Sequence, residues 1–411
     1  MSVEQAYQQR MNRLDTVISL QEPDRVPFVP QTGDFVATAY GLSQYDMMKD
    51  LRNVIPCIKK YLTRFQPDLV WPVYGFSIDP CELLHANFIR LPGPSHGLPR
   101  NSGFQMMDGT YMEEDEFDEY LMDPTHFMLT KVLPRKYKAL EPLSKLHFRE
   151  VYDLKVMTEW GVLAQSDVKA AMDALMQAGQ MMHRHMMHNI QVGKCIREMG
   201  FATFGGTTHA PFDLYADSLR GLVQGVMDVK LYPDEVLAVT ERIEQMNTDR
   251  FVAGVKARGE RFVFIPLHAA GDEFMSRDDY AAFYWPGLKR TIEKLVAAGI
   301  TPLVFCEGKY NTRLDFLKDV PKGKVIYMFE QVDIVKVKKE LGDVACICGN
   351  FPTTLLVTGS KEQVVDETKR MLDACAPGGG FIMNCSITMD ACKMENFEAW
   401  YDTTMTYGVY K

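Results

Sequence analysis

The chain has 411 residues, of which 46% are hydrophobic and 24% charged, a balance typical of a globular protein that buries a large core. Its formal net charge of −9, without a dense Lys/Arg cluster, argues against nucleic-acid binding. The polar N-terminal stretch has no apolar signal core, and no run of about 18 apolar residues follows, so we expect a cytoplasmic protein that does not span a membrane.

Short apolar runs bounded by turn residues alternate along the chain with helical patterns. Most of these runs are apolar on both faces, which is typical of parallel strands covered on both sides. Eight repeats of strand and helix predict a closed (β/α)8 TIM barrel that forms a single domain over residues 1–411. The predicted strands are Phe28–Gln31, Leu69–Tyr74, Ala202–Phe204, Arg261–His268, Leu303–Cys306, Val325–Phe329, Val344–Cys348 and Phe381–Cys385.

One connection is much longer than the others. Residues 75–200, between the second and third predicted strands, form an insertion that we expect to cover the mouth of the barrel with loops and helices. Its methionine-rich run, residues 181–188 (MMHRHMMH), favours a helix whose soft side chains pack into an irregular core. A methionine-lined pocket or partner-docking surface is the alternative.

Nine cysteines, six of them in the last 106 residues, favour reduced thiols and metal binding over a disulfide framework. A catalytic zinc uses three protein ligands and leaves one position open. Glu307, Cys348 and Cys385 each follow or end a predicted strand and are suitable ligands by residue type. His268 is a rival ligand, and burial of both cysteines as small apolar residues is the alternative.

Other polar and aromatic residues near the predicted strand ends complete the candidate site, because the active site of such a barrel lies at the carboxyl ends of its strands. We expect His268, Asp272 and His209 to act as acids or bases. The candidates for substrate binding are Asp34, Phe35, Tyr74, Tyr310 and Asn350.

Five segments resemble landmarks of the uroporphyrinogen decarboxylase superfamily. They are Glu22–Pro30, Gly205–Leu214, Val304–Gly308, Cys348–Leu356 and Ala376–Asn384. The superfamily's decarboxylases carry an Arg-rich segment after the first strand, where this chain reads PQTGD at residues 30–34. The resemblance therefore favours the corrinoid-dependent methyltransferase branch over tetrapyrrole decarboxylation.

Methyltransferases of this branch that act on thiols carry His-x-Cys after the fifth strand, where this chain has Phe305-Cys306-Glu307. A set of Glu307, Cys348 and Cys385 is similar to the zinc site of methanol:corrinoid methyltransferase. The resemblance thus implies a zinc-dependent O-demethylase component that moves a methyl group from a methylated substrate, such as a phenyl methyl ether, to the Co(I) corrinoid of a partner protein.

Three other functions stay open at this point, and so does a homodimer. The first is a methylcorrinoid:thiol or pterin methyltransferase. The second is a decarboxylase of the uroporphyrinogen type, and the third is a non-catalytic binding barrel. No corrinoid-binding D-x-H-x-x-G motif occurs in the chain, so a corrinoid would have to arrive with its own protein.

Overall fold

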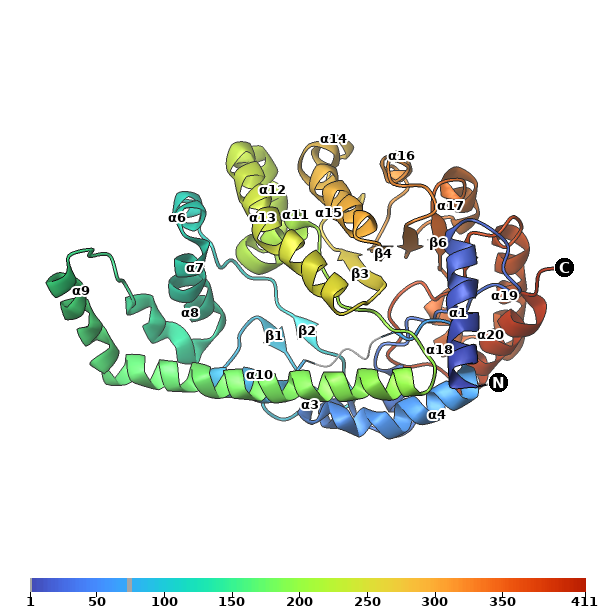
Figure 1. The fold of residues 1–411 in the computed structure, drawn as a ribbon, viewed down its shortest axis with the longest axis horizontal. Helices are drawn as coiled ribbons and strands as arrows, with labels where there is room; N and C mark the ends of the chain where they lie inside the picture. Colours follow the sequence, from blue (N-terminus) through green and yellow to red (C-terminus); the bar gives the residue numbers. More distant parts are fainter. Residues whose placement is uncertain (1, 72–75) are drawn as a thin grey trace.

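The computed structural model describes residues 2–71 and 76–411, and its centre is a parallel sheet of five consecutive strands (Figure 1). In register, Leu267 lies beside Cys306, and Cys306 lies beside Phe329. The carboxyl ends of these strands therefore lie at one common edge. The strands are β3 (Phe262–Leu267), β4 (Thr301–Cys306), β5 (Ile326–Phe329), β6 (Cys346–Cys348) and β7 (Phe381–Ile382).

The three N-terminal segments predicted as strands close this sheet into a ring through single bridges. Phe28 bridges Met383 just beyond β7, and the Phe28 carbonyl accepts a 2.9 Å hydrogen bond from the Asp68 amide. Val70 bridges Thr203 in parallel, and the third segment reaches β3 through a 2.7 Å bond from the Gly205 amide to the Phe262 carbonyl. The chain is therefore a TIM barrel, as the alternating pattern predicted.

These three segments make bridges rather than full strands because their ladders are interrupted. Pro27 and Pro30 flank Phe28 and have no N–H group to donate. The third segment runs into Gly205 and Gly206, and the latter has a φ of +150°, which favours glycine. The predicted end of the second strand, including Tyr74, lies outside the described residues.

Helices surround the barrel on its outer side. Those before the insertion are α1 (Val3–Ile18), α2 (Phe35–Thr38), α3 (Gln44–Lys49) and α4 (Ile55–Phe65). Those after it are α11 (Pro211–Tyr215), α12 (Leu222–Leu231), α13 (Pro233–Ala257), α14 (Arg277–Asp279), α15 (Trp285–Ala297), α16 (Leu314–Leu317), α17 (Ile334–Leu341), α18 (Thr353–Thr358), α19 (Lys361–Cys375) and α20 (Met394–Tyr407). Short 3-10 or π-helical turns add η1 (Leu51–Val54), η5 (Ala216–Arg220) and η6 (Tyr280–Tyr284).

The insertion forms its own group of elements. They are α5 (Ile78–Leu84), β1 (Ile89–Arg90), β2 (Gln105–Met106), α6 (Phe117–Met122), α7 (Pro124–Phe127), η2 (Met128–Val132), α8 (Leu133–Lys136), η3 (Lys138–Lys145), α9 (Asp153–Glu159), η4 (Trp160–Ala164) and α10 (Ser166–Glu198). Leu84, Leu140, Leu143 and Val168 belong to a small apolar core separate from that of the barrel.

Part of the insertion approaches the strand ends and part does not. The amides of Tyr111 and Met112 donate hydrogen bonds to the Leu219 carbonyl, close to the loop that follows the third barrel segment. By contrast, α9 and the first half of the 33-residue α10 extend away from the strands, at the left of Figure 1. None of the described helices combines the length and the apolar character needed to cross a membrane.

Strand side chains pack in two directions, and this decides which residues can reach the mouth. Trp71, Phe264, Phe305 and Met328 pack together in one cluster with Cys348. Their neighbours along the strands, such as Ile265, Cys306 and Tyr327, pack in the other cluster, toward the surrounding helices. The alternation follows from the two-residue period of a strand.

Candidate functional site

A histidine paired with carboxylates lies at the carboxyl ends of β3 and β4. His268 directly follows β3, and its Nδ1 donates a 2.6 Å hydrogen bond to Oδ2 of Asp217. Its Nε2 lies 3.9 Å from Oε1 of Glu307, which directly follows β4. Both ring nitrogens therefore face carboxylates, as suits an imidazolium.

Asp217 and a second aspartate, Asp213, lie one helical turn apart, so they project toward the same loop. Asp213 is fully buried, and it accepts a 2.9 Å hydrogen bond from the Ala269 amide and a 2.6 Å bond from the Tyr284 hydroxyl. Asp213 thereby fixes the loop that carries His268. Burial raises the pKa of Asp213 to about 6.

The charges around His268 shift its protonation equilibrium strongly. Burial alone would lower the pKa of His268, but the hydrogen bond to Asp217 and the charges of Asp213, Asp217 and Glu307 raise it to about 10. The imidazole is therefore protonated at neutral pH. Burial raises the pKa of Glu307 to about 7, although the charge of His268 acts in the opposite direction.

His209 is the second histidine of the cluster. Its ring centroid lies 5.6 Å from that of His268. Burial, followed by the positive charge of His268, lowers the pKa of His209 to about 4. His209 is therefore neutral near pH 7. The pair thus combines a protonated and a neutral imidazole whose pKa values differ widely, an arrangement typical of acid–base sites.

The expected zinc ligands Glu307, Cys348 and Cys385 are not brought together. Cys348 packs inside the barrel beside Met328, where its Sγ lies 3.5 Å from Nδ2 of Asn384. Cys385 packs in the outer core, and its Sγ donates to the Gln31 carbonyl at 3.7 Å.

Burial raises the pKa of Cys385 to about 12, which opposes the thiolate form that a metal requires. Within residues 2–71 and 76–411, no three His, Cys, Asp or Glu side chains are grouped closely enough to hold one metal ion. The predicted donor set therefore does not fit a three-ligand zinc in this arrangement.

Asp34 follows the first barrel segment, at the start of α2. The carboxylate is 3% exposed, accepts a 2.8 Å hydrogen bond from Nε2 of Gln44, and leaves Oδ1 without a partner. Burial and the charge of Asp390 raise the pKa of Asp34 to about 7. Asp34 therefore adds a second, separate acidic group.

Four other predicted site residues, Asp272, Asn350, Phe35 and Tyr310, make structural contacts. Asp272 binds Arg313 and accepts a 2.7 Å hydrogen bond from the Thr312 hydroxyl, which fixes the loop after β4. Asn350 donates to the carbonyls of Glu330 and Val332, both at 3.0 Å.

The aromatic candidates for substrate binding face the helices. Phe35 packs against Phe397 with ring centroids 5.1 Å apart, and Tyr310 is fully buried in the same outer core. Neither lines the mouth. Tyr74 lies outside the described residues, so the structure does not place it.

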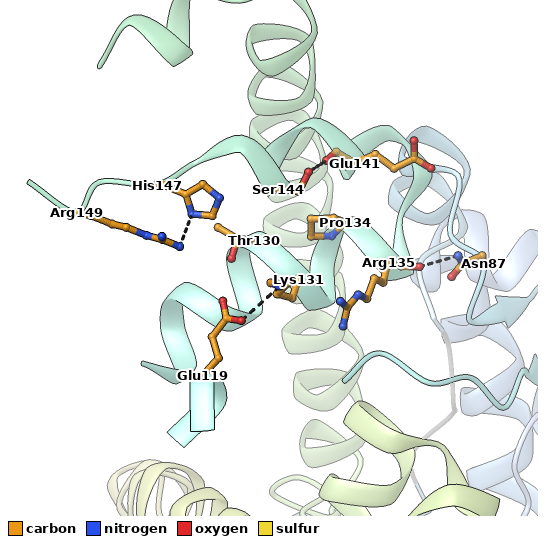
Figure 2. A pocket seen from close by; sticks show the side chains of 10 residues that line it. All are labelled: Asn87, Glu119, Thr130, Lys131, Pro134, Arg135, Glu141, Ser144, His147 and Arg149. Atoms are coloured by element: carbon orange, nitrogen blue, oxygen red, sulfur yellow. Dashed lines mark hydrogen bonds and ion pairs between the residues drawn. The ribbon is translucent and has the colours of Figure 1, made fainter. Parts of the chain in front are cut away.

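One cavity lies in the insertion, away from the strand ends. Figure 2 shows this space of about 740 Å³, whose lining includes Glu119, Lys131 and Arg135. Glu116 lies 3.0 Å from Lys131 and 2.6 Å from Arg135, so these cations are already paired. A smaller cavity of about 410 Å³ lies beside the mouth and is lined partly by Glu330 and Asn350.

Asp213 and Asp217 are the two site residues that sequence reasoning missed. They lie in α11 and η5, after the third segment, whereas the sequence-based prediction considered only residues at the strand ends. Their spacing of four residues, directly after the Gly-Gly-Thr-Thr-His turn, is the signal that could have identified them.

Three comparisons show which known proteins this chain is similar to. The profile of the family described as "Uroporphyrinogen decarboxylase (URO-D)" matches residues 166–407. A uroporphyrinogen decarboxylase of Chlorobaculum parvum is 30% identical over 99 residues. That match covers 24% of this chain and 28% of the relative, so it spans well under two thirds of the relative's length.

Among solved structures, a methyltransferase from Methanosarcina mazei superposes with a TM-score of 0.63. It is 13% identical, and the match covers 97% of this chain and 98% of that one, which shows a common fold. Because the family profile spans more than half of the chain, the protein belongs to the uroporphyrinogen decarboxylase family.

Proposed function

We propose that this protein is a methyltransferase that takes a methyl group from the oxygen of a methylated substrate, such as a phenyl methyl ether. The acceptor is the Co(I) corrinoid of a partner protein. The observation that carries the proposal is the imidazolium of His268, held between Asp217 and Glu307 at the carboxyl end of the barrel.

The proposed chemistry needs an acid at this place. As the C–O bond breaks, the bonding electrons stay on the ether oxygen, and the electron pair of the acceptor forms the new bond to the methyl group. His268 can donate a proton to the leaving oxygen, with Asp217 orienting its ring. The pKa of His268, about 10, matches that of a phenol, so the proton transfer is close to balanced.

The charge of the mouth favours methyl transfer over decarboxylation of a polycarboxylate. The side chains that surround His268 carry the carboxyl groups of Asp217 and Glu307. Such a surface repels a substrate that carries several carboxylates. A neutral or cationic methylated compound meets no such barrier.

This mechanism does not include the zinc expected from the sequence, because its proposed ligands Glu307, Cys348 and Cys385 do not lie together. From their packing, we expect Cys348→Ala and Cys385→Ala to leave the zinc content of the purified protein unchanged. About one zinc per chain that disappears in either variant would contradict this expectation, because it would require the two sulfurs to share an ion.

The experiment that tests the function uses the full chain, a Co(I) corrinoid protein and a panel of methyl donors. We expect methoxylated aromatics to yield methyl-Co(III), followed by its absorbance, together with an equal amount of phenol. Incubation of methyl-Co(III) protein with thiols or pterins covers the opposite direction. Release of CO2 from a polycarboxylated tetrapyrrole, with no methyl transfer from any donor, would overturn the proposal in favour of decarboxylation.

A further inference from the structure

A lysine of the insertion, Lys136, has no ionic partner among the described residues. It is the last residue of α8, and its Nζ lies 4.5 Å from the ring centroid of Tyr111 and 5.4 Å from that of Phe88. Within residues 2–71 and 76–411, its ammonium makes no hydrogen bond and no ion pair. By contrast, Lys131 and Arg135 of the same segment both pair with a glutamate. The charge of Lys136 is therefore not balanced by a direct contact.

The surroundings of Lys136 are aromatic and poor in water. Burial lowers the pKa of Lys136 to about 8, although the charge of Asp217 acts in the opposite direction. The ammonium form still predominates near pH 7. Aromatic ring faces attract a cation, but they do not replace a counter-ion that accepts its hydrogen bonds. A charge held in such a place without a partner is unfavourable, so an anionic ligand would supply what the chain lacks.

Backbone contacts connect the surroundings of Lys136 to the turn that carries Asp217. The Tyr111 amide donates a 2.7 Å hydrogen bond to the carbonyl of Leu219, two residues after Asp217. Asp217 is the charged group that acts on Lys136, and the same carboxylate accepts the hydrogen bond from His268. The ammonium of Lys136 and the imidazolium of His268 are therefore both near one carboxylate.

Ligands can reach both cations. The side chains of His268, Asp217 and Glu307 are 33%, 31% and 37% exposed, and Lys136 is also partly exposed. Neither cation is sealed off by the protein. Because Lys136 makes no ion pair within the described chain, it can bind an anion without breaking one.

We infer that Lys136 binds a single carboxylate of the substrate, while the methoxy group of the same molecule lies at His268. This inference rests on the proposed function and narrows its substrates to methoxylated aromatic acids. The aromatic ring of a methoxybenzoate separates the two groups, so one molecule can present both. One ammonium balances one carboxylate, and the carboxyl groups around His268 therefore still disfavour a polycarboxylate.

The test measures the affinity of the full chain for paired ligands by isothermal titration calorimetry, without a corrinoid protein. The ligands are the ortho, meta and para methoxybenzoates and the matching methoxybenzamides, which have nearly the same shape but no charge. We expect the tightest-binding methoxybenzoate to bind roughly 10-fold to 100-fold more tightly than its amide, which is the usual contribution of a hydrogen bond to a charged group. Lys136→Met keeps the apolar body of the side chain and removes its charge, so it should abolish this preference and leave the affinity for the amide unchanged.

Two further variants separate the charge of Lys136 from its packing. Lys136→Arg restores a cation and should retain much of the preference for the carboxylate. Lys138→Met removes an exposed charge two residues away and should keep the wild-type preference. Loss of affinity for acid and amide alike in Lys136→Met would assign Lys136 a structural role and overturn the inference.

Other outcomes separate this inference from the proposed function. Equal affinity of the wild type for acids and amides would overturn the inference, and so would no binding of any methoxybenzoate or a preference that survives Lys136→Met. Binding of carboxylates that depends on Lys136, with no methyl transfer to Co(I) from any donor, would support the carboxylate site and contradict the proposed function. Demethylation of neutral methoxybenzenes, with no effect of Lys136→Met on binding, would retain the function and overturn only the inference.

Discussion

Charged side chains are paired differently at the two ends of the barrel. At the amino ends of the strands, Asp68 is fully buried and accepts hydrogen bonds from Arg13 at 2.6 Å and Arg25 at 2.7 Å. At the carboxyl ends, His268 is one cation among several carboxylates, including Asp217 and Glu307. The first arrangement neutralises charge, and the second leaves an excess of negative charge.

In barrels of this kind, residues at the amino ends of the strands stabilise the fold and residues at the carboxyl ends carry the chemistry, and the two charge arrangements follow this division. Asp68 also accepts a 2.8 Å hydrogen bond from the Phe28 amide, so its ion pairs connect α1 to the first barrel segment. Around His268, by contrast, the pKa values of Glu307 and Asp213 are raised to about 7 and about 6. Carboxyl groups with raised pKa values cluster at functional sites, and of these two only the partly exposed Glu307 can exchange protons with a substrate.

Replacement of His268, the proposed acid at the carboxyl ends of the barrel strands, should have the largest effect on activity. We expect His268→Gln to lower the turnover number for demethylation by about 100-fold to 10,000-fold, the usual contribution of a positioned acid. The urea midpoint should also fall, because glutamine can hydrogen-bond Asp217 but does not replace the cation among Asp213, Asp217 and Glu307. Turnover is therefore compared where both proteins are folded. Single-turnover methyl transfer measures the loss, and a variant that keeps wild-type turnover would remove His268 from the mechanism.

The matching change is at Asp68, at the amino ends of the barrel strands, and should affect the stability of the fold rather than the chemistry. Asp68→Asn leaves Arg13 and Arg25 buried without their counter-charge, which should lower the free energy of unfolding by about 3–5 kcal/mol. Urea denaturation measures it. Asp24→Asn removes the other partner of Arg13, a carboxylate with 54% of its side chain exposed, and should lower the same free energy by less than about 1 kcal/mol. Equal losses in the two variants would contradict the comparison.

The contribution of Asp217 to His268 can be measured through pH. His268 acts only while protonated, so activity should be lost as pH rises through its pKa of about 10. Asp217→Asn removes the largest influence that raises this pKa, so the basic limb of kcat/KM should move to lower pH. Asp217→Glu should restore much of the wild-type profile. An unchanged basic limb in Asp217→Asn would assign Asp217 a purely structural role.

The sequence predicted the fold better than the site, and strand geometry explains why. Apolar runs are enough to locate eight barrel segments, even where proline reduces one of them to a single bridge at Phe28. Which way a strand-end residue points depends on register, and a shift of one residue reverses it. Asn384 contacts Cys348 inside the barrel, so its neighbour Cys385 faces outward, and no sequence pattern distinguishes these two outcomes.

Residues brought in by helices are harder still to foresee. Strand ends alone place His268 and Glu307 near each other, since β3 and β4 are adjacent and their last residues, Leu267 and Cys306, are in register. Asp217 reaches His268 from a π-helical turn, so its contribution depends on helix packing that apolar periodicity does not encode. The charge environment of the site therefore becomes visible only in three dimensions.

The smallest expected effect is the contribution of Glu307, at the carboxyl ends of the barrel strands, to the pH dependence of stability. Between its ordinary pKa of 4.5 and the raised value of about 7, Glu307 binds more protons in the folded than in the unfolded protein. Stability therefore falls as pH rises through this window, and the loss is complete above pH of about 7. Glu307→Gln should weaken this decline, so the urea midpoint of the variant should rise relative to that of the wild type between pH 4.5 and pH 8.

Glu293→Gln, on the exposed face of α15, is the matched control and should keep the wild-type decline. Parallel pH profiles for wild type and Glu307→Gln would mean that Glu307 takes up no extra proton on folding and carries its negative charge throughout this window, which would contradict its raised pKa.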